Sequence, residues 1–489
     1  MLFHFDNSYT RLPERFYARL APTKVSAPRL IRINRPLAEE LGLDPDWLAS
    51  PEGVAVLSGN SVPEGAAPLA MVYAGHQFGH FVPQLGDGRA ILLGEVRAPD
   101  GGHYDLHLKG SGRTPFSRNG DGRAALGPML REYIVSEAMH ALGIPTTRAL
   151  AAVATGETIL REQGMLPGAV LTRVARSHVR VGTFEFFANR GDPEGVRHLA
   201  DYVVVRLYPD AAAAPNPYLA LLEAVVARTA ALIARWQLVG FVHGVMNTDN
   251  TSIVGETIDY GPCAFMDAYH PATVFSSIDS GGRYAYDQQP RIAYWNLTRF
   301  AQTLLPLLDE SEDAATGAAR KAMDAYPALF EATYVTGLRA KFGMTESREN
   351  DLELVGAFFR LMTEAGADFT LTFRYLCDSA EMRADGLRAL FGNRPALGEW
   401  LAKWRQRLSP ENISPEERAA AMRGVNPVYI PRNHRVETAI AAARESGDLA
   451  PFEEFLEVLS APYNERPEYT PYADPPRAHE IVRQTFCGT

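Results

Sequence analysis

The sequence predicts an α+β protein in which a strand-rich part precedes a helical part. From about residue 70 to 175, short runs of strand-like composition alternate with Gly, Pro and Asp turn signals. After about residue 190, apolar residues recur with helical spacing instead. The chain has 489 residues, 46% of them hydrophobic, which is enough for two or more cores.

Composition and charge exclude several classes of function. The formal net charge is −10, so the chain as a whole is not suited to coating nucleic acid. Cys263, Cys377 and Cys487 are too few for a disulfide scaffold and fit a reducing compartment. The N-terminus lacks the apolar segment of a secretory signal, and charged residues interrupt the apolar region 221–245. We therefore expect a cytoplasmic protein that has neither nucleic acid nor membrane as a partner.

Two hairpins and one helix organise the strand-rich part. AILLGEVRA and YDLHLKG are joined by the turn residues 99–102, and RALAAVAT and TILRE by 155–157. Between the two hairpins, ALGPMLREYIVSEAMHALG has helical periodicity and ends at Gly143. Hairpin, helix, hairpin is the order of a protein-kinase N-lobe, so we predict a bilobal, protein-kinase-like fold. A short helix is also expected in PLAEELGLDPDWL, residues 36–48.

The helical part is expected to form the second lobe. NPYLALLEAVVARTAALIARWQLVGF reads as one long helix, and shorter helices are expected within 297–309, 348–365, 413–423 and 435–446. The last 28 or so residues look loop-like. The predicted division is an N-terminal extension 1–69, an N-lobe 70–175, a C-lobe with additions 176–460, and a tail 461–489.

The long helix leads into HGVMNTDNTSIVGETIDYGP, which has the spacing of a kinase catalytic loop and its D-F-G segment. His243 and Asn250 match that loop, and Asp259 begins Asp-Tyr-Gly. Val245, however, stands where a kinase has its catalytic Asp. An amide oxygen at Asn250 and a carboxylate at Asp259 suit a magnesium ion bound to nucleotide phosphates. The alternative is that both side chains only cap turns.

Two Gly-Asp-Gly-Arg stretches could approach phosphate groups. Gly86 and Gly88 precede Arg89 before a strand, where small residues let backbone N–H groups come close to an anion. Asp121 and Gly122 repeat the theme in the Gly- and Arg-rich loop GSGRTPFSRNGDGRAALG. An ordinary hairpin turn and a surface loop are the alternatives.

Lys109 ends the strand YDLHLKG, the position of the lysine that neutralises phosphate in a kinase N-lobe. Its partner would come from the following helix, where Glu132 and Glu137 are both candidates. They are five residues apart and point in different directions, so only one of them can pair well. The alternative for Lys109 is a solvated surface charge.

LTRVARSHVRVGTFE concentrates Arg173, Arg176 and Arg180 around His178. Guanidinium groups suit phosphate oxygens, although acidic side chains of the same protein could satisfy them instead. HQFGH, residues 76–80, has the i,i+4 histidine spacing of a zinc helix but lacks its Glu and contains Gly79. We expect strand or turn packing there.

Taken together, the motifs resemble the selenoprotein O family of protein-kinase-like pseudokinases over nearly the whole chain. The resemblance is carried by YAGHQFGHFVPQLGDGRA, LHLKGSGRTPFSRNGDGRAAL, LREYIVSEAMHALGIPTTRAL, LTRVARSHVRVGTFEFF, HGVMNTDNTSIVGETIDYGP, GRYAYDQQPRIAYWNL and NPVYIPRNH. It implies a nucleotidyltransferase that moves AMP from ATP, bound in a flipped orientation, to protein hydroxyls. Some bacterial members are described as using UTP with manganese.

The resemblance also assigns roles by motif. Asp249 would be the proton acceptor, Asn250 and Asp259 would bind Mg²⁺ or Mn²⁺, and Glu132 would pair with Lys109. The nucleotide-binding residues would be Gly86, Gly88, Arg89, Lys109, Asp121, Gly122, Arg173, Arg180 and Asp259. Partners would be protein substrates, with redox proteins among the candidates, and the chain itself.

Cys487 occupies the tail position where animal members of the family carry selenocysteine. A disulfide with Cys263 is a hypothesis that would link the redox state of the tail to the active site. Two alternatives to adenylyl transfer stay open. A phosphotransferase is disfavoured by Val245, and a non-catalytic nucleotide-binding scaffold would not need this set of polar residues.

Overall fold

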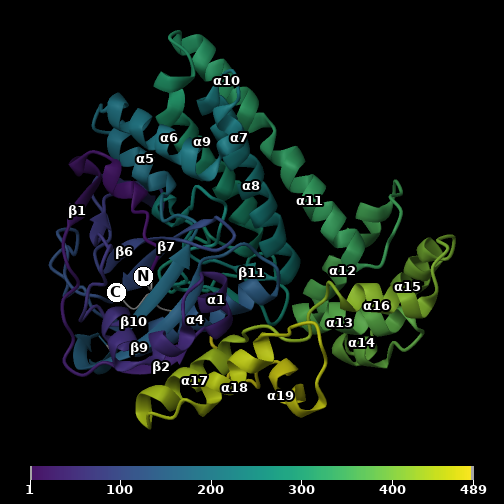
Figure 1. The fold of residues 1–489 in the computed structure, drawn as a ribbon. Helices are drawn as coiled ribbons and strands as arrows, with labels where there is room; N and C mark the ends of the chain where they lie inside the picture. The colour runs from purple at the N-terminus through teal and green to yellow at the C-terminus, as the bar shows by residue number, and fades with distance from the viewer. Residues whose placement is uncertain (1–2, 163, 486–489) are drawn as a thin grey trace.

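The computed structural model describes residues 3–162 and 164–485 and combines one large sheet with many helices (Figure 1). The sheet has eight antiparallel strands in the order β1-β3-β6-β7-β10-β9-β2, and β8 pairs with β10. Its strands are β1 Tyr17–Arg19, β2 Arg29–Ile33, β3 Leu69–Met71, β6 Ala90–Arg97, β7 His103–Lys109, β8 Ala124–Ala125, β9 Arg148–Arg161 and β10 Gly164–Ala175. The α+β class predicted from the sequence is confirmed.

The first predicted hairpin and the predicted helix are also confirmed. Strands β6 and β7 pair antiparallel around the turn at residues 99–102. Helix α4, Leu126–Ala141, follows them and packs against β9 and β10. Two small sheets lie apart from the main one, β4 Gly75–Gln77 with β5 His80–Val82, and β11 Phe241–Val242 with β12 Ala264–Phe265.

The turn predicted for the second hairpin, at residues 155–157, was wrong. Residues 148–161 form the single strand β9, and its partner is β10 rather than its own second half. The pairs Thr158–Pro167 and Ala154–Ala169 flank a register shift, so residues 155–157 form a bulge opposite Gly168. The turn was predicted from Thr155, Gly156 and Glu157. Gly156 has a positive φ of 74°, which a bulge can use without reversing the chain.

The expected helix over residues 36–48 is two short helices, because Gly42 has a φ of 70° and Asp44 caps a new start at Pro45. The predicted helices within 297–309, 348–365, 413–423 and 435–446 are present as α9, α12, α16 and α17. The helices other than α4 are α1 Arg35–Glu40, α2 Pro45–Ala49, α3 Pro51–Leu57, α5 Val181–Ala188, α6 Pro193–Leu207, α7 Pro209–Ala212, α8 Pro217–Val239, α9 Gln289–Leu308, α10 Glu312–Asp324, α11 Tyr326–Lys341, α12 Asp351–Ala365, α13 Phe369–Ala380, α14 Asp385–Leu390, α15 Pro395–Leu408, α16 Pro415–Arg423, α17 Asn433–Glu445, α18 Ala450–Leu459 and α19 Thr470–Ala473.

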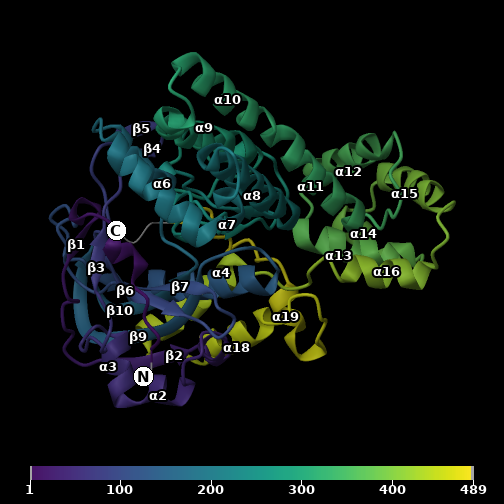
Figure 2. The same cartoon turned by 45° about the horizontal axis from the view of Figure 1, so that its top comes forward.

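The helices after α4 form three groups. Helices α5 to α10 lie together on one side of it, and α11 leads away to the group α12–α16 (Figures 1 and 2). Helices α17 and α18 return to the sheet, where they pack against α4. The C-terminal helices therefore cover the helix that carries Glu132.

Helix α8 is the core of the helical part. It packs against α9 and α11 and ends at Gly240, whose φ is 72°, so that β11 and the loop from His243 follow directly. By length and composition alone it could cross a membrane, but half of its apolar window is buried inside the protein. The core helix of a protein meets the same test, and the sequence-based interpretation was an amphipathic helix rather than a membrane span.

Arg432 joins three distant segments. Its side chain is wholly buried and donates to Asp267 after β12, to Asp368 at the start of α13, and to the carbonyl oxygen of Ala473 in α19. The Asp267 contact is 2.5 Å and the shorter Asp368 contact 2.8 Å. Removing the cation would leave two carboxylates in a largely buried place without their partner.

We expect Arg432→Ala to lower the free energy of unfolding by about 3–5 kcal/mol, measured by urea denaturation. Arg444→Ala is the matched control, because Arg444 lies on α17 with a side chain 41% exposed and, among residues 3–162 and 164–485, pairs with its neighbour Glu445 alone. That variant should change stability by less than about 0.5 kcal/mol. Equal effects of the two substitutions would contradict the joining role of Arg432.

Candidate active site

A cavity of about 1700 Å³ lies between the sheet and the loop that follows α8. It is walled by the loop before β6, the end of β7, the start of α4, strand β10 and the segment 245–262. Every predicted site residue within the described ranges lines it: Gly86, Gly88, Arg89, Lys109, Asp121, Gly122, Glu132, Arg173, Arg180, Asp249, Asn250 and Asp259. Cys487, and with it the hypothesis of a disulfide to the buried Cys263, lies outside the described residues.

Asp259 is the electrostatic centre of this cavity. Arg173 and Arg180 each donate to one of its carboxylate oxygens at 2.5 Å, and the Nζ of Lys109 is 3.5 Å away. Burial alone would raise the pKa of Asp259, but the three cations hold it well below its usual range. The carboxylate is therefore charged at any physiological pH.

The structure distinguishes between the two candidate partners of Lys109. Lys109 makes an ion pair with Glu132, which also accepts from Arg173 at 3.2 Å. Glu137 points elsewhere and binds Arg148 at 2.8 Å and the backbone N–H of Ala149. The helix α4 thus turns Glu132, not Glu137, toward the cavity.

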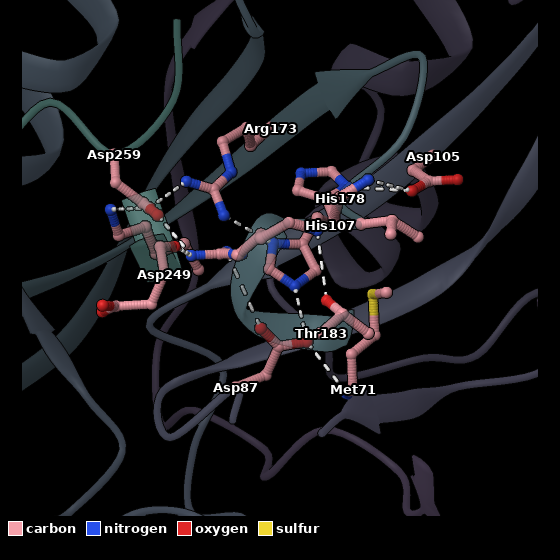
Figure 3. A network of polar contacts seen from close by, with 12 residues as sticks. Met71, Asp87, Asp105, His107, Arg173, His178, Thr183, Asp249 and Asp259 are labelled. Atoms are coloured by element: carbon pink, nitrogen blue, oxygen red, sulfur yellow. Dashed lines mark hydrogen bonds and ion pairs between the residues drawn. The ribbon is translucent and has the colours of Figure 1, made fainter. Parts of the chain in front are cut away.

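A layer of residues that the sequence did not single out lies behind these cations. His107 contacts Arg173 on one side and Asp87 on the other, and Asp87 accepts the backbone N–H of Met71 (Figure 3). Asp87 stands between the two predicted glycines and is only 3% exposed. In the sequence, the signal for Asp87 was a charged residue between two glycines of a turn. The partners of Asp87 could not be read from the sequence.

Asp249 is buried beside this cluster, and one of its carboxylate oxygens has no hydrogen-bond partner among the described residues. Its Oδ2 accepts from the side chain of Gln77 at 3.0 Å, whereas Oδ1 has no partner among the described residues. Burial raises the pKa of Asp249 to about 6, and the Gln77 hydrogen bond moderates that rise. Next to it, the amide nitrogen of Asn250 donates to the carbonyl oxygen of Val245 at 3.0 Å, which leaves the amide oxygen to accept from elsewhere.

The HQFGH stretch forms the hairpin β4–β5 and packs on the loop of Asp249, as expected for strand and turn packing. His76 contacts Glu185 at 2.6 Å, and its backbone N–H donates to the hydroxyl of Thr248. No group of three or more His, Cys, Asp and Glu side chains in residues 3–162 and 164–485 has the geometry to hold a metal ion.

The remaining residues of the predicted basic cluster do not all lie at the cavity. Arg176 is exposed outside the cavity, and His178 is buried against Asp105 at 3.0 Å. Asp121 is held at the rim by Arg161, whose two contacts measure 2.8 and 3.0 Å. Of the arginine cluster, only Arg173 and Arg180 line the cavity.

The fold and the cavity define an α+β protein with a large cavity lined by buried ion pairs. Residues 1–460 match the model of the family described as protein adenylyltransferase SelO. Similar proteins include the protein nucleotidyltransferase YdiU of Rhodopseudomonas palustris (strain BisB5), 62% identical over 489 residues, which cover 100% of this chain and 99% of that protein. Those of Bradyrhizobium sp. (strain ORS 278) and Methylorubrum populi are 62% and 61% identical, each over 100% of this chain and 99% of the relative. The chain belongs to the SelO family, which confirms the resemblance seen in its motifs.

We expect Lys109→Met to weaken the binding of ATP by about 10- to 100-fold, because a charge-assisted hydrogen bond would be lost in a buried place. Calorimetric titration with ATP and a divalent cation measures this directly. Lys403→Met, on the exposed face of α15, is the control and should bind as the unsubstituted protein does. Unchanged affinity of the Lys109 variant would remove this lysine from the nucleotide site.

Proposed function

We propose that this chain transfers AMP from ATP to the hydroxyl group of Ser, Thr or Tyr side chains in proteins and releases pyrophosphate. The observation that carries the proposal is the pairing of two features in one cavity. Lys109, Arg173 and Arg180 gather around one carboxylate, and the proposed base Asp249 has a buried oxygen without a hydrogen-bond partner among the described residues. Membership in a family of protein adenylyltransferases supports the reaction class.

The proposed reaction needs only positioning and charge neutralisation. The acceptor hydroxyl gives its proton to Asp249 while its oxygen attacks the α-phosphorus. The bond from that phosphorus to the bridging oxygen breaks, and pyrophosphate leaves with the electron pair. Lys109, Arg173 and Arg180 would neutralise the charge that grows on the leaving oxygens.

The charges of the cavity fit a divalent cation. Three cations, Lys109, Arg173 and Arg180, face three carboxylates, Glu132, Asp87 and Asp259, so the cluster alone has little positive charge to spare. A triphosphate would add negative charge that this set does not balance. The oxygens of Asn250 and Asp259 would hold Mg²⁺ or Mn²⁺, which supplies further neutralisation of the phosphates when bound.

We also propose a bilobal, protein-kinase-like arrangement with an N-lobe over residues 70–175, a C-lobe over 176–460 and a tail from 461. The hairpin, helix and hairpin order and the ion pair between β7 and α4 support it. The N-terminal extension 1–69 contributes β1 and β2 to the edges of the main sheet, so it would be part of the N-lobe in space.

Two rival functions make different use of the same cavity. A phosphotransferase would need a base at the position of Val245, which is a buried apolar side chain. A nucleotide-binding scaffold would need the cations but not a buried carboxylate at Asp249 with an oxygen that has no partner among the described residues. Adenylyl transfer uses both features, and UTP as a second nucleotide donor is compatible with them.

Protein substrates follow from the proposed reaction, with redox proteins and the chain itself among the candidates. Cytoplasmic location is part of the proposal too. Cys377 is a buried free thiol, which agrees with a reducing compartment.

Labelled nucleotides separate the three functions. With ATP labelled on the α- or the γ-phosphate, we expect label to reach protein only from the α position, and Asp259→Ala to abolish transfer. Transfer from the γ position would establish a kinase, and no transfer from either position, with ATP still bound, would establish a scaffold. An arm with α-labelled UTP tests the second donor.

Gly75 gives a test of the proposed base that leaves its carboxylate in place. A Cβ built on Gly75 would lie 2.4 Å from Oδ1 of Asp249, so Gly75→Ala must displace that side chain. We expect kcat for transfer to fall by about 10- to 100-fold with a smaller change in ATP affinity, because misplacement of a reacting group acts on the chemical step.

Gly398→Ala is the matched control for Gly75→Ala. Gly398 lies on the exposed face of α15, and a Cβ there would have no atom within 4 Å. This variant should transfer AMP at the unsubstituted rate. Full activity of the Gly75 variant would show that Asp249 is not the base.

A further inference from the structure

His107 lies between two charged groups of opposite sign. Its Nδ1 is 3.1 Å from an Nη of Arg173, and its Nε2 is 3.2 Å from a carboxylate oxygen of Asp87. The ring is wholly buried, with 0% exposure. Residues alternate sides along a strand, so His107 on β7 shares the face of Lys109, which lines the cavity.

The chemistry of the two partners fixes the protonation of the ring. A guanidinium nitrogen can only donate, so Nδ1 of His107 must accept and carry no proton. A carboxylate oxygen can only accept, so Nε2 must carry the proton and donate to Asp87. The neutral Nε2–H tautomer is the one form of the imidazole that satisfies both contacts.

We propose that His107, as this neutral tautomer, is a positioning residue that holds the guanidinium of Arg173 toward the nucleotide phosphates and ties it to the glycine-rich loop through Asp87. This inference rests on the proposed nucleotide site. It deepens that site by joining the loop of Gly86 and Gly88 to Arg173, the cross-strand neighbour of His107 on β10, through one imidazole ring.

The groups around the ring favour its neutral form. Burial comes first, and Arg173 and Arg180 add to it, so the pKa of His107 lies below its ordinary value although Asp87 opposes the shift. His178 stacks on His107 with ring centroids 4.2 Å apart and is itself held by Asp105. Burial lowers the pKa of His178 to about 3, so no second imidazolium faces the ring.

This environment predicts how the contact between His107 and Arg173 depends on pH. A histidine whose pKa is lower in the folded protein stays neutral as pH falls through the ordinary range near 6.5. Only at more acidic pH would a proton reach Nδ1, where it would face the N–H of Arg173 and break the contact. Arg173 should thus keep its acceptor throughout the neutral range and lose it on strong acidification.

The test compares two substitutions of similar size. Glutamine can accept from Arg173 with its oxygen and donate to Asp87 with its nitrogen, whereas leucine fills the space and does neither. We expect His107→Leu to lower kcat/KM for ATP by about 10- to 100-fold and His107→Gln to restore most of it. If the ring only fills space, leucine should serve at least as well as glutamine, and that order would overturn the proposal.

A second readout does not depend on transfer. In protein labelled with ¹⁵N at histidine, the His107 signals, assigned by their loss in His107→Gln, should show a bare Nδ1 and a protonated Nε2 from about pH 8 to about pH 6.5. An Nδ1–H tautomer, or ordinary titration in that range, would overturn the proposal even if AMP transfer occurs. Absence of AMP transfer with the expected tautomer would instead overturn the proposed function and leave the contact of His107 with Arg173 standing.

His479→Leu serves as the control for histidine loss, since His479 is exposed in the C-terminal segment. It should leave kcat/KM and the His107 signals unchanged. Folding of the His107→Leu variant is checked by its urea midpoint, so that a loss of activity is attributed to Arg173 only where the midpoint stays close to that of the unsubstituted protein.

Discussion

The buried carboxylate of Asp259 is the constraint on which the site depends. It comes from the loop beyond α8, and the cations that neutralise it come from β7, β10 and the segment before α5. A buried charge without partners is strongly destabilising, so the sheet and the helical part must meet at this point with their cations in place. The same contact that joins the two parts of the protein therefore also builds the wall of its cavity.

This origin explains why the cavity is nearly balanced in charge. The sequence left open whether Arg173 and Arg180 serve an anionic ligand or acidic side chains of the chain itself. They bind Asp259 directly, and Arg173 also contacts Glu132. A phosphate group that approached them would have to share donors with those acids. Guanidinium groups have five N–H donors and permit such sharing, which is one physical reason for arginine rather than lysine at both positions.

Local patterns predicted the fold where local geometry decides it. Strand-like runs and turn residues predicted β6 and β7, and helical periodicity predicted α4. The motifs predicted residues that line the cavity. The turn at 155–157 was misplaced because Gly156 serves a bulge and a turn equally well. Glu132 could not be separated from Glu137 by spacing, since the choice depends on how α4 sits against β7. The roles of His107 and Gln77 were invisible for a related reason, because their partners lie 20 to 172 residues away in the chain.

The hairpin β4–β5 offers an explanation for the apolar residue at Val245. Gly75 and Gln77 of this hairpin lie directly against Asp249, and Gly182 is close enough that its missing Cβ makes room for Ala74 at the hairpin's base. These contacts fix a carboxylate four residues beyond the place where a kinase has its base. With that carboxylate in position, a second acid at 245 would add like charge to a buried site. We infer that the apolar residue at 245 and the hairpin that holds Asp249 belong to one arrangement, in which the proposed base acts from a different side of the cavity.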